Sequence, residues 1–167
     1  MSISEYTTLQ GRTLKVSWDE APTLPPRELI TQVCGLCFTD DNQIVLVAGS
    51  DSKWTFPGIP PEQNESIEDA LVRIAREEGC VSVLRFTYLG AQQFDDPSNP
   101  DGLTRHYSVK FWARVQLERF MPRLEIEYRT TVAPAAFLAT IKPVTPRIAQ
   151  AVLEAACKAN EMAKHQE

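Results

Sequence analysis

The sequence predicts an α/β fold in which a mixed β-sheet is sandwiched between helices. Short alternating or β-branched segments recur on both sides of an amphipathic helix near the middle of the chain, and a second long helical segment closes it. The length of 167 residues suits one hydrophobic core. No internal repeat or low-complexity tract divides the chain, so we expect a single domain over residues 1–167.

The N-terminal part of the chain, residues 1–28, has the pattern of a strand or hairpin. Residues 6–18 alternate loosely and contain Gly11, and the prolines of residues 22–26 favour a stiff connector. The predicted core covers residues 29–141. Its strands are expected at residues 29–38, 43–48, 54–56, 81–93, 106–117 and 127–132.

The central helix is expected at residues 66–78. Ser66 is a suitable N-cap, with Asp69 three residues later as an acidic partner, and Gly79 stands where a glycine often ends a helix. One face carries apolar residues at helical spacing, which are Ile67, Ala70, Leu71 and Ile74. This face should pack on the sheet.

Two more helices are predicted after the last strand. Residues 134–141 suit a short helix, and residues 146–164 suit a longer C-terminal helix. Thr145 is expected to cap this longer helix, and Pro146 occupies its first turn, where a missing N–H costs little.

The composition indicates a globular protein that is not expected to bind nucleic-acid polymers or to span a membrane. Hydrophobic residues make up 43% and charged residues 23%, which is an ordinary balance. The net charge of −5 argues against a nucleic-acid backbone as partner, because such binders present basic surfaces. The chain has no apolar run of about 18 residues, and its first residues are polar. We therefore expect a cytoplasmic protein.

Cys34 and Cys37 form a C-x-x-C pair within an apolar, strand-like run. Residues three apart in a strand face opposite sides of a sheet, so these thiols are not expected to share a metal. A second C-x-x-C that could complete a zinc site is absent from the sequence. We expect reduced cysteines with a structural role.

Four glutamates make residues 54–81 the most informative stretch of the chain. Glu62 and Glu65 lie in a proline-rich turn before the central helix, and Glu77 and Glu78 end that helix. Mg²⁺ and Mn²⁺ prefer oxygen ligands and bind substrate phosphates at the same time. Convergence of these carboxylates on one cation would support metal-assisted phosphate chemistry. A solvated helix face with Glu–Arg pairs is the simpler alternative.

This stretch resembles the Nudix box, G-x5-E-x7-R-E-U-x-E-E-x-G-U, where U is a bulky aliphatic residue. Four charged positions match in register: Glu65, Arg73, Glu77 and Glu78. Val81 matches the last aliphatic position, and the Trp-Thr-Phe-Pro-Gly of residues 54–58 resembles the strand and turn that commonly lead into the box. Glu62 stands where many members carry a further acidic residue.

Three of the glycine and charged positions differ from the box. Ile59 replaces the first glycine, although Gly58 precedes it, and Cys80 replaces the last glycine. Ile74 replaces the glutamate that follows the arginine. Position 74 also lies one turn before Glu77 and Glu78, on the same side of the helix. With isoleucine there, this side carries two carboxylates, whereas the box has three.

The resemblance implies the Nudix α/β/α sandwich over roughly residues 29–141. It implies an enzyme that uses Mg²⁺ or Mn²⁺ to cleave the pyrophosphate of a nucleoside diphosphate linked to another group. Metal ligands would be Glu62, Glu65, Glu77 and Glu78, and catalytic roles would fall to Arg73, Glu77, Glu78 and Glu127. The alternative, which the isoleucine at position 74 keeps open, is a Nudix-like module that binds a nucleotide or a protein without turnover. A homodimer is compatible with either function.

Several later residues are weaker candidates. In the family a glutamate from a later loop often acts as base or ligand, which favours Glu127, with Glu125 as the second choice. Pro97 lies at an offset that resembles members acting on ADP-ribose, so the expected substrate includes ADP-ribose-like compounds. His106 could contact a phosphate, although a structural or exposed histidine is the commoner case. Trp54 could stack on a base, although packing explains it equally well.

Overall fold

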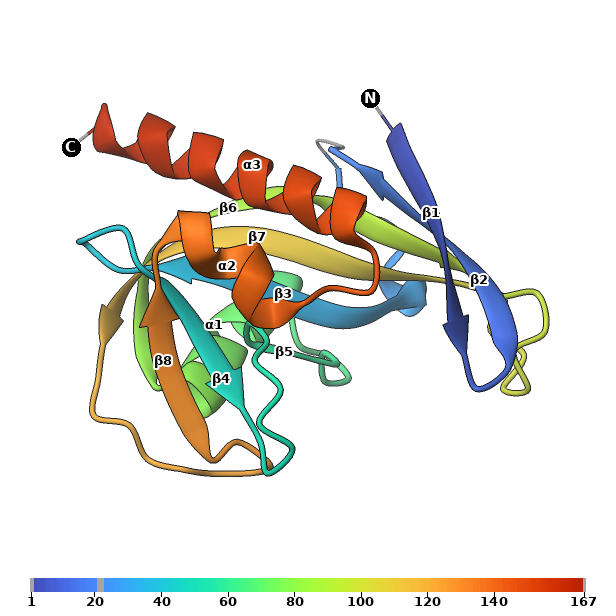
Figure 1. The fold of residues 1–167 in the computed structure, drawn as a ribbon, viewed down its shortest axis with the longest axis horizontal. Helices are drawn as coiled ribbons and strands as arrows, with labels where there is room; N and C mark the ends of the chain where they lie inside the picture. The colour runs from blue at the N-terminus through green and yellow to red at the C-terminus, as the bar shows by residue number, and fades with distance from the viewer. Residues whose placement is uncertain (1, 21–22, 167) are drawn as a thin grey trace.

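The computed structural model of the chain describes residues 2–20 and 23–166 and has three layers (Figure 1). A mixed β-sheet forms the middle layer. Helix α1 (Ile67–Gly79) covers one face, and helices α2 (Pro134–Ile141) and α3 (Pro146–Lys164) cover the other. The predicted α/β/α sandwich is therefore confirmed.

The sheet has eight strands, seven of them in the order β1-β2-β6-β7-β3-β4-β8, and β5 pairs with β3. The strands are β1 (Ser2–Leu9), β2 (Arg12–Asp19), β3 (Ile30–Phe38), β4 (Ile44–Ala48), β5 (Gly58–Ile59), β6 (Val81–Asp95), β7 (Arg105–Leu117) and β8 (Tyr128–Val132). The pair β3–β7 is parallel and the others are antiparallel. A short 3₁₀ turn, η1 (Arg27–Leu29), leads into β3.

The N-terminal hairpin forms as predicted. β1 and β2 pair over their whole length, and the turn between them places Gln10 and Gly11 at positive φ, where glycine carries no penalty. The connector predicted at residues 22–26 begins outside the described residues, which resume at Thr23.

Helix α1 packs its predicted apolar face on the sheet. Ile67, Ala70, Leu71 and Ile74 are all buried. They pack against β3 and β7, where Val33 and Phe111 are fully or almost fully buried. The Ser66 hydroxyl accepts a hydrogen bond from the Asp69 N–H at 3.0 Å, which confirms the N-cap.

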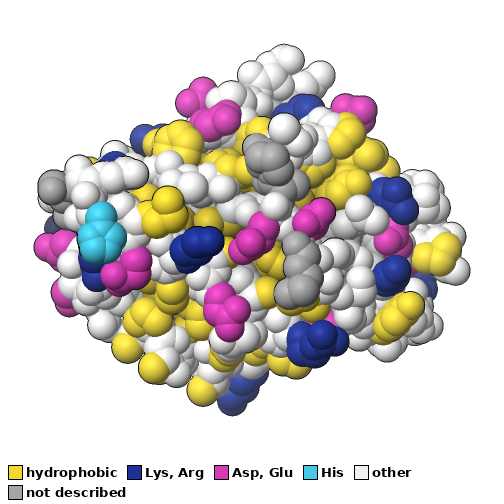
Figure 2. Space-filling model, turned by 90° about the horizontal axis from the view of Figure 1, so that it is seen from above, with side chains coloured by type: hydrophobic (Ala, Val, Ile, Leu, Met, Phe, Trp, Pro, Cys, Tyr) yellow, Lys and Arg dark blue, Asp and Glu magenta, His cyan; other side chains and the backbone are white. Residues whose placement is uncertain are grey.

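The opposite face of the sheet packs against α3. Trp112 of β7 belongs to this second core together with Ile148 and Val152 of α3. Cys34 and Cys37 are free and face opposite sides, as expected: Cys34 contacts Lys110, and Cys37 packs in the cluster that contains Ala75 of α1. From the α3 side, basic and acidic side chains are interspersed with apolar ones (Figure 2).

Two local predictions were wrong. Residues 54–56 do not form a strand; Thr55 makes a single bridge to Val47, and Pro57, which has no N–H, cannot extend it. Pairing resumes at β5 instead. The left-handed residue after α1 is Cys80, at φ 51°, whereas Gly79 is still helical.

None of the helices in the described part of the chain combines the length and apolar surface that a transmembrane span needs.

Candidate functional site

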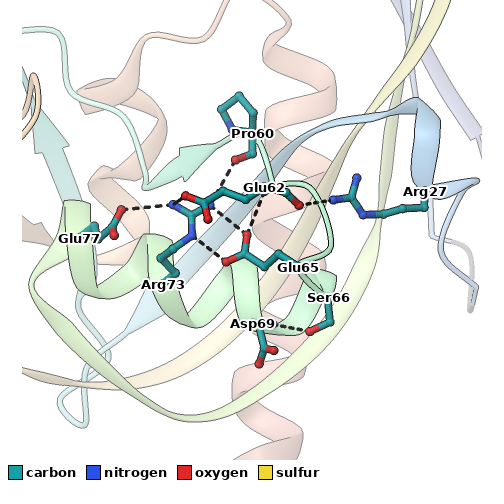
Figure 3. Close-up of polar contacts among 8 residues, drawn as sticks. All are labelled: Arg27, Pro60, Glu62, Glu65, Ser66, Asp69, Arg73 and Glu77. Carbon is teal, nitrogen blue, oxygen red and sulfur yellow. Dashed lines mark hydrogen bonds and ion pairs between the residues drawn. The ribbon is translucent and has the colours of Figure 1, made fainter.

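Arg73 gathers three of the predicted site carboxylates around its guanidinium group (Figure 3). Its Nε and Nη2 donate to the two oxygens of Glu65, at 2.7 and 3.0 Å. Nη1 donates to Oε2 of Glu77 at 3.2 Å and lies 3.8 Å from Oε1 of Glu62. The side chains of Arg73 and Glu65 are each only 14% exposed. Water therefore screens this ion pair less than a surface pair.

The same group of residues fixes the turn before α1. Glu65 accepts the backbone N–H of Glu62 at 3.0 Å, and Arg27 donates to the Glu62 carbonyl at 2.8 Å. Arg73 also donates to the Pro60 carbonyl at 3.4 Å (Figure 3). The hydrogen bonds from Arg73 lower the pKa of Glu65, against the opposing effect of burial. Glu65 therefore acts as the anchor of this turn.

Glu78 lies apart from this cluster and points to the turn that leads into β5. Its Oε1 accepts the Gly58 N–H at 2.9 Å. Burial raises the pKa of Glu78, the Gly58 hydrogen bond lowers it, and the charge of Glu77 raises it further. Among the described residues no basic side chain forms an ion pair with Glu78. A carboxylate that is half-buried and has no ion pair among the described residues is well suited to bind a cation.

The structure thus divides the four predicted metal ligands, and their convergence on one point is not found. Glu62, Glu65 and Glu77 gather on Arg73, while Glu78 turns to Gly58. Within residues 2–20 and 23–166, no three acidic, histidine or cysteine side chains are arranged to hold a metal ion. Metal binding by these glutamates stays a prediction.

Ile74 lies in the core. Its side chain is fully buried in the cluster that joins α1 to β3 and β7. Position 74 lies at helical spacing both from the apolar residues of α1 and from Glu77 and Glu78. Its side chain packs with the apolar residues. Glu77 and Glu78 stay half-buried at the border of that stripe.

Gly58 joins the Glu78 carboxylate to the interior of the sheet. A Cβ atom at this position would lie 2.6 Å from Sγ of Cys34, its partner across β5 and β3, so the close approach requires glycine. Cys34 in turn lies 3.4 Å from Nζ of Lys110, which donates to the Ser108 hydroxyl at 2.7 Å. A row of polar side chains thus leads inward from Gly58.

A cavity of about 210 Å³ lies between residues 54–56 and helices α2 and α3. Its walls are mainly apolar and aromatic, and include Trp54, Phe56, Phe137, Ile141, Ile148 and Val152. Phe56 stacks on Phe137 with ring centroids 6.0 Å apart, and Lys110 Nζ lies 5.3 Å from the Phe56 centroid. Lys110 and Gln92 are the long polar side chains in the lining.

Glu127 and Glu125 are exposed and line a second, larger hollow of about 670 Å³. Asp51 and Lys53 line it too, and Thr55 borders both hollows. The backbone N–H of Glu127 donates to the Ala48 carbonyl at 2.9 Å, which fixes the main chain, and the residue is exposed. The structure brings Glu127 near the segment that leads into the box.

Sequence reasoning missed Lys110. It lies in the middle of β7, in an otherwise apolar run, and only 5% of it is exposed. A lysine at an inward-facing position of a buried strand was the available signal, since lysine is almost never buried without a specific reason. His106 contacts Thr31 and stacks on Phe94, which is a structural setting.

The family model of the NUDIX domain matches residues 29–151. The chain belongs to the Nudix family. Cys80 adopts the left-handed conformation that the last glycine of the Nudix box would adopt without strain, so this departure needs no shift in register. No relative is found among curated protein sequences.

Solved structures support the same fold. A Nudix hydrolase from Nitrosomonas europaea aligns with a TM-score of 0.59 at 22% identity, over 78% of this chain and 90% of its own. A pyrophosphohydrolase from Bacillus subtilis aligns with a TM-score of 0.58 at 20% identity, over 76% of each chain. An ADP-ribose pyrophosphatase from Streptococcus suis aligns with a TM-score of 0.51 at 19% identity, over 75% of this chain and 90% of its own.

Proposed function

We propose that this Nudix protein hydrolyses the pyrophosphate linkage of a nucleoside diphosphate bound to another group, with the help of a divalent cation. The observation that carries the proposal is the five-residue segment 54–58. Trp54, Thr55 and Phe56 line the smaller cavity, while Gly58 holds Glu78. A base in the cavity and a pyrophosphate beside Glu78 would therefore lie at the two ends of one segment.

The carboxylates fit Mg²⁺ or Mn²⁺ in part. Glu78 and Glu77 are the residues that would hold the cation, with water and phosphate oxygens supplying the other ligands. Bound there, the cation would neutralise the pyrophosphate and make a nearby water more acidic. Glu65 is better explained as a support, because both of its oxygens accept hydrogen bonds from Arg73, whereas Glu77 accepts only one. Glu62 belongs to the turn that Glu65 holds through the Glu62 N–H.

The remaining roles follow from position. Arg73 keeps Glu77 oriented and ties the turn at residues 60–65 to α1, so it is a positioning residue. Glu127 is proposed as the base that takes a proton from water, with Glu125 as the second choice, because both are solvent-accessible carboxylates beside Thr55. Their reach depends on movement of exposed side chains.

A second candidate, nucleotide binding without turnover, is favoured by one observation. Ile74 is fully buried where the box has a glutamate, which leaves the α1 end with fewer carboxylates. This function uses the same cavity and the same Glu78, but needs no activated water.

A hydrolysis assay separates the two functions. The full chain is incubated with Mg²⁺ or Mn²⁺ and a panel of nucleotide sugars, dinucleotides, ADP-ribose and nucleoside triphosphates, and the release of nucleoside monophosphate or phosphate is measured. Turnover that Glu127→Gln or Glu78→Gln strongly reduces supports the hydrolase. Tight binding of panel members without any product supports the binding module and overturns hydrolysis.

A further inference from the structure

Lys110 is a buried cation that has no counter-charge in the part of the chain that the structure describes. Its residue is 5% exposed, and among the described residues no carboxylate forms an ion pair with it. A buried ammonium group is costly unless its N–H groups meet acceptors. The two acceptors it has are Oγ of Ser108 at 2.7 Å and Sγ of Cys34 at 3.4 Å. An ammonium group has three N–H donors, so one remains.

The neighbouring side chains fix the direction of these hydrogen bonds. The Ser108 hydroxyl donates to Oε1 of Gln32 at 3.2 Å, so its oxygen is left to accept from Lys110. An ammonium group acts only as a donor, and the third N–H of Lys110 has no hydrogen-bond acceptor among the described residues. Nζ lies 5.3 Å from the centroid of the Phe56 ring, and both line the cavity, where a ligand oxygen could accept this N–H.

The cavity suits a flat ring better than a phosphate. Lys110 is the single basic side chain among its described lining residues, and the walls are mainly apolar and aromatic. A phosphate would bring more negative charge than one ammonium group can balance. The volume of about 210 Å³ is below the roughly 300 to 1,000 Å³ of sites that enclose a whole drug-sized ligand. It therefore accommodates one ring system with the rest of the ligand outside.

We propose that Lys110 selects nucleobases that carry a carbonyl at position 6 of a purine or position 4 of a pyrimidine, such as hypoxanthine, guanine or uracil, over adenine and cytosine, which carry an amino group at that position. This inference rests on the proposed function, because it assumes that the cavity takes the base of a nucleotide. A carbonyl oxygen accepts the free Lys110 N–H, whereas an exocyclic amino group would set N–H against N–H and leave both unpaired. A site built around a buried polar group rejects ligands that leave it unpaired.

Gln92 supports the same preference. Its side chain lines the cavity and offers both an amide oxygen and an amide N–H. A lactam ring carries an N–H beside its carbonyl, and the Gln92 oxygen is an acceptor for it. Adenine-containing compounds, ADP-ribose among them, would then bind less tightly than their hypoxanthine counterparts.

Two matched pairs of ligands test the inference. Inosine diphosphate and adenosine diphosphate differ at position 6 of the purine, and uridine diphosphate and cytidine diphosphate differ at position 4 of the pyrimidine. Calorimetric titration of the full chain with excess Mg²⁺ should give affinities about tenfold or more higher for the carbonyl member of each pair. Lys110→Met keeps most of the length of the side chain without its N–H donors and should reduce each ratio to about one. Lys158→Met, which removes an exposed lysine of α3, should preserve both ratios.

The possible failures are distinct. Equal affinities within both pairs in the wild type, or ratios that survive in Lys110→Met, would overturn the role of Lys110 while nucleotide binding stands. Absence of binding for all four diphosphates would overturn the proposed function and this inference together. The wild-type comparison needs no variant, so poor folding of Lys110→Met does not remove the test.

Discussion

Arg73 and Glu65, eight residues apart, are joined by two hydrogen bonds, from Nε and Nη2 of the arginine to the two carboxylate oxygens. Arg73 also bonds Glu77, one turn further along α1. One guanidinium group thus holds the turn before the helix and a carboxylate near the helix end. The position of the turn therefore depends on this arginine.

Arg73→Met should destabilise the protein by about 2 to 3 kcal/mol, because it leaves the mostly buried carboxylate of Glu65 without its partner. Arg76→Met is the matched control: Arg76 is an exposed arginine on the same helix, and its loss should cost less than about 0.5 kcal/mol. Urea unfolding of the three proteins gives both values. Equal stability of Arg73→Met and the wild type would contradict a structural role for the Arg73 cluster.

Ile74→Glu should destabilise the fold by several kcal/mol rather than restore a metal ligand, because it places an unpaired carboxylate in the core. Ile74→Val removes one methylene and should cost only about 0.5 to 1.5 kcal/mol. Thermal or denaturant unfolding distinguishes the two variants. A stable Ile74→Glu protein with stronger Mg²⁺ binding would mean that this side chain can turn toward Glu77 and Glu78.

Glu78→Gln should weaken binding of Mn²⁺ or Mg²⁺ by about tenfold or more, since it removes a charge that no basic side chain balances within residues 2–20 and 23–166. The amide oxygen of glutamine can still accept the Gly58 N–H, so the fold should be unaffected. Glu68→Gln, an exposed position on the same helix, is the control. Calorimetry in the presence of a nucleotide measures all three proteins, and equal affinities in wild type and Glu78→Gln would remove the proposed metal site.

The sequence predicted the layers and most elements because periodicity and capping are local signals. Ser66 and the apolar stripe of α1 define that helix by themselves, and the Nudix box fixes its register. The order of strands across the sheet, with β3 parallel to β7, depends on pairing between distant segments and could not be predicted from local patterns.

The site was harder to predict because several of its side chains could form more than one set of contacts. Spacing brought four glutamates within reach of one another, but it could not show that Arg73 neutralises Glu65. Ile74 fitted two helical spacings at once, and only packing decides between them. Lys110 and Phe137 come together with residue 56 through tertiary structure alone.

His106 should make a pH-dependent contribution to stability. It stacks on Phe94 with centroids 4.9 Å apart, and its Nδ1 lies 3.1 Å from the Thr31 hydroxyl. Burial lowers the pKa of His106, and the opposing charge of Asp96 only partly offsets this effect. Asp96 is itself held by Arg12 at 2.9 Å, so its charge is largely committed elsewhere.

The wild type should therefore lose stability as the pH falls below about 6.5, the ordinary histidine pKa. In that range the unfolded chain takes up a proton that the folded protein resists, so the free energy of unfolding decreases until the pH reaches the lowered folded pKa. His106→Gln should lack this part of the slope. His165→Gln, which removes the exposed second histidine, should keep it. Urea midpoints measured at several pH values between about 7.5 and 5 compare the three proteins; parallel curves for His106→Gln and the wild type would contradict the assignment.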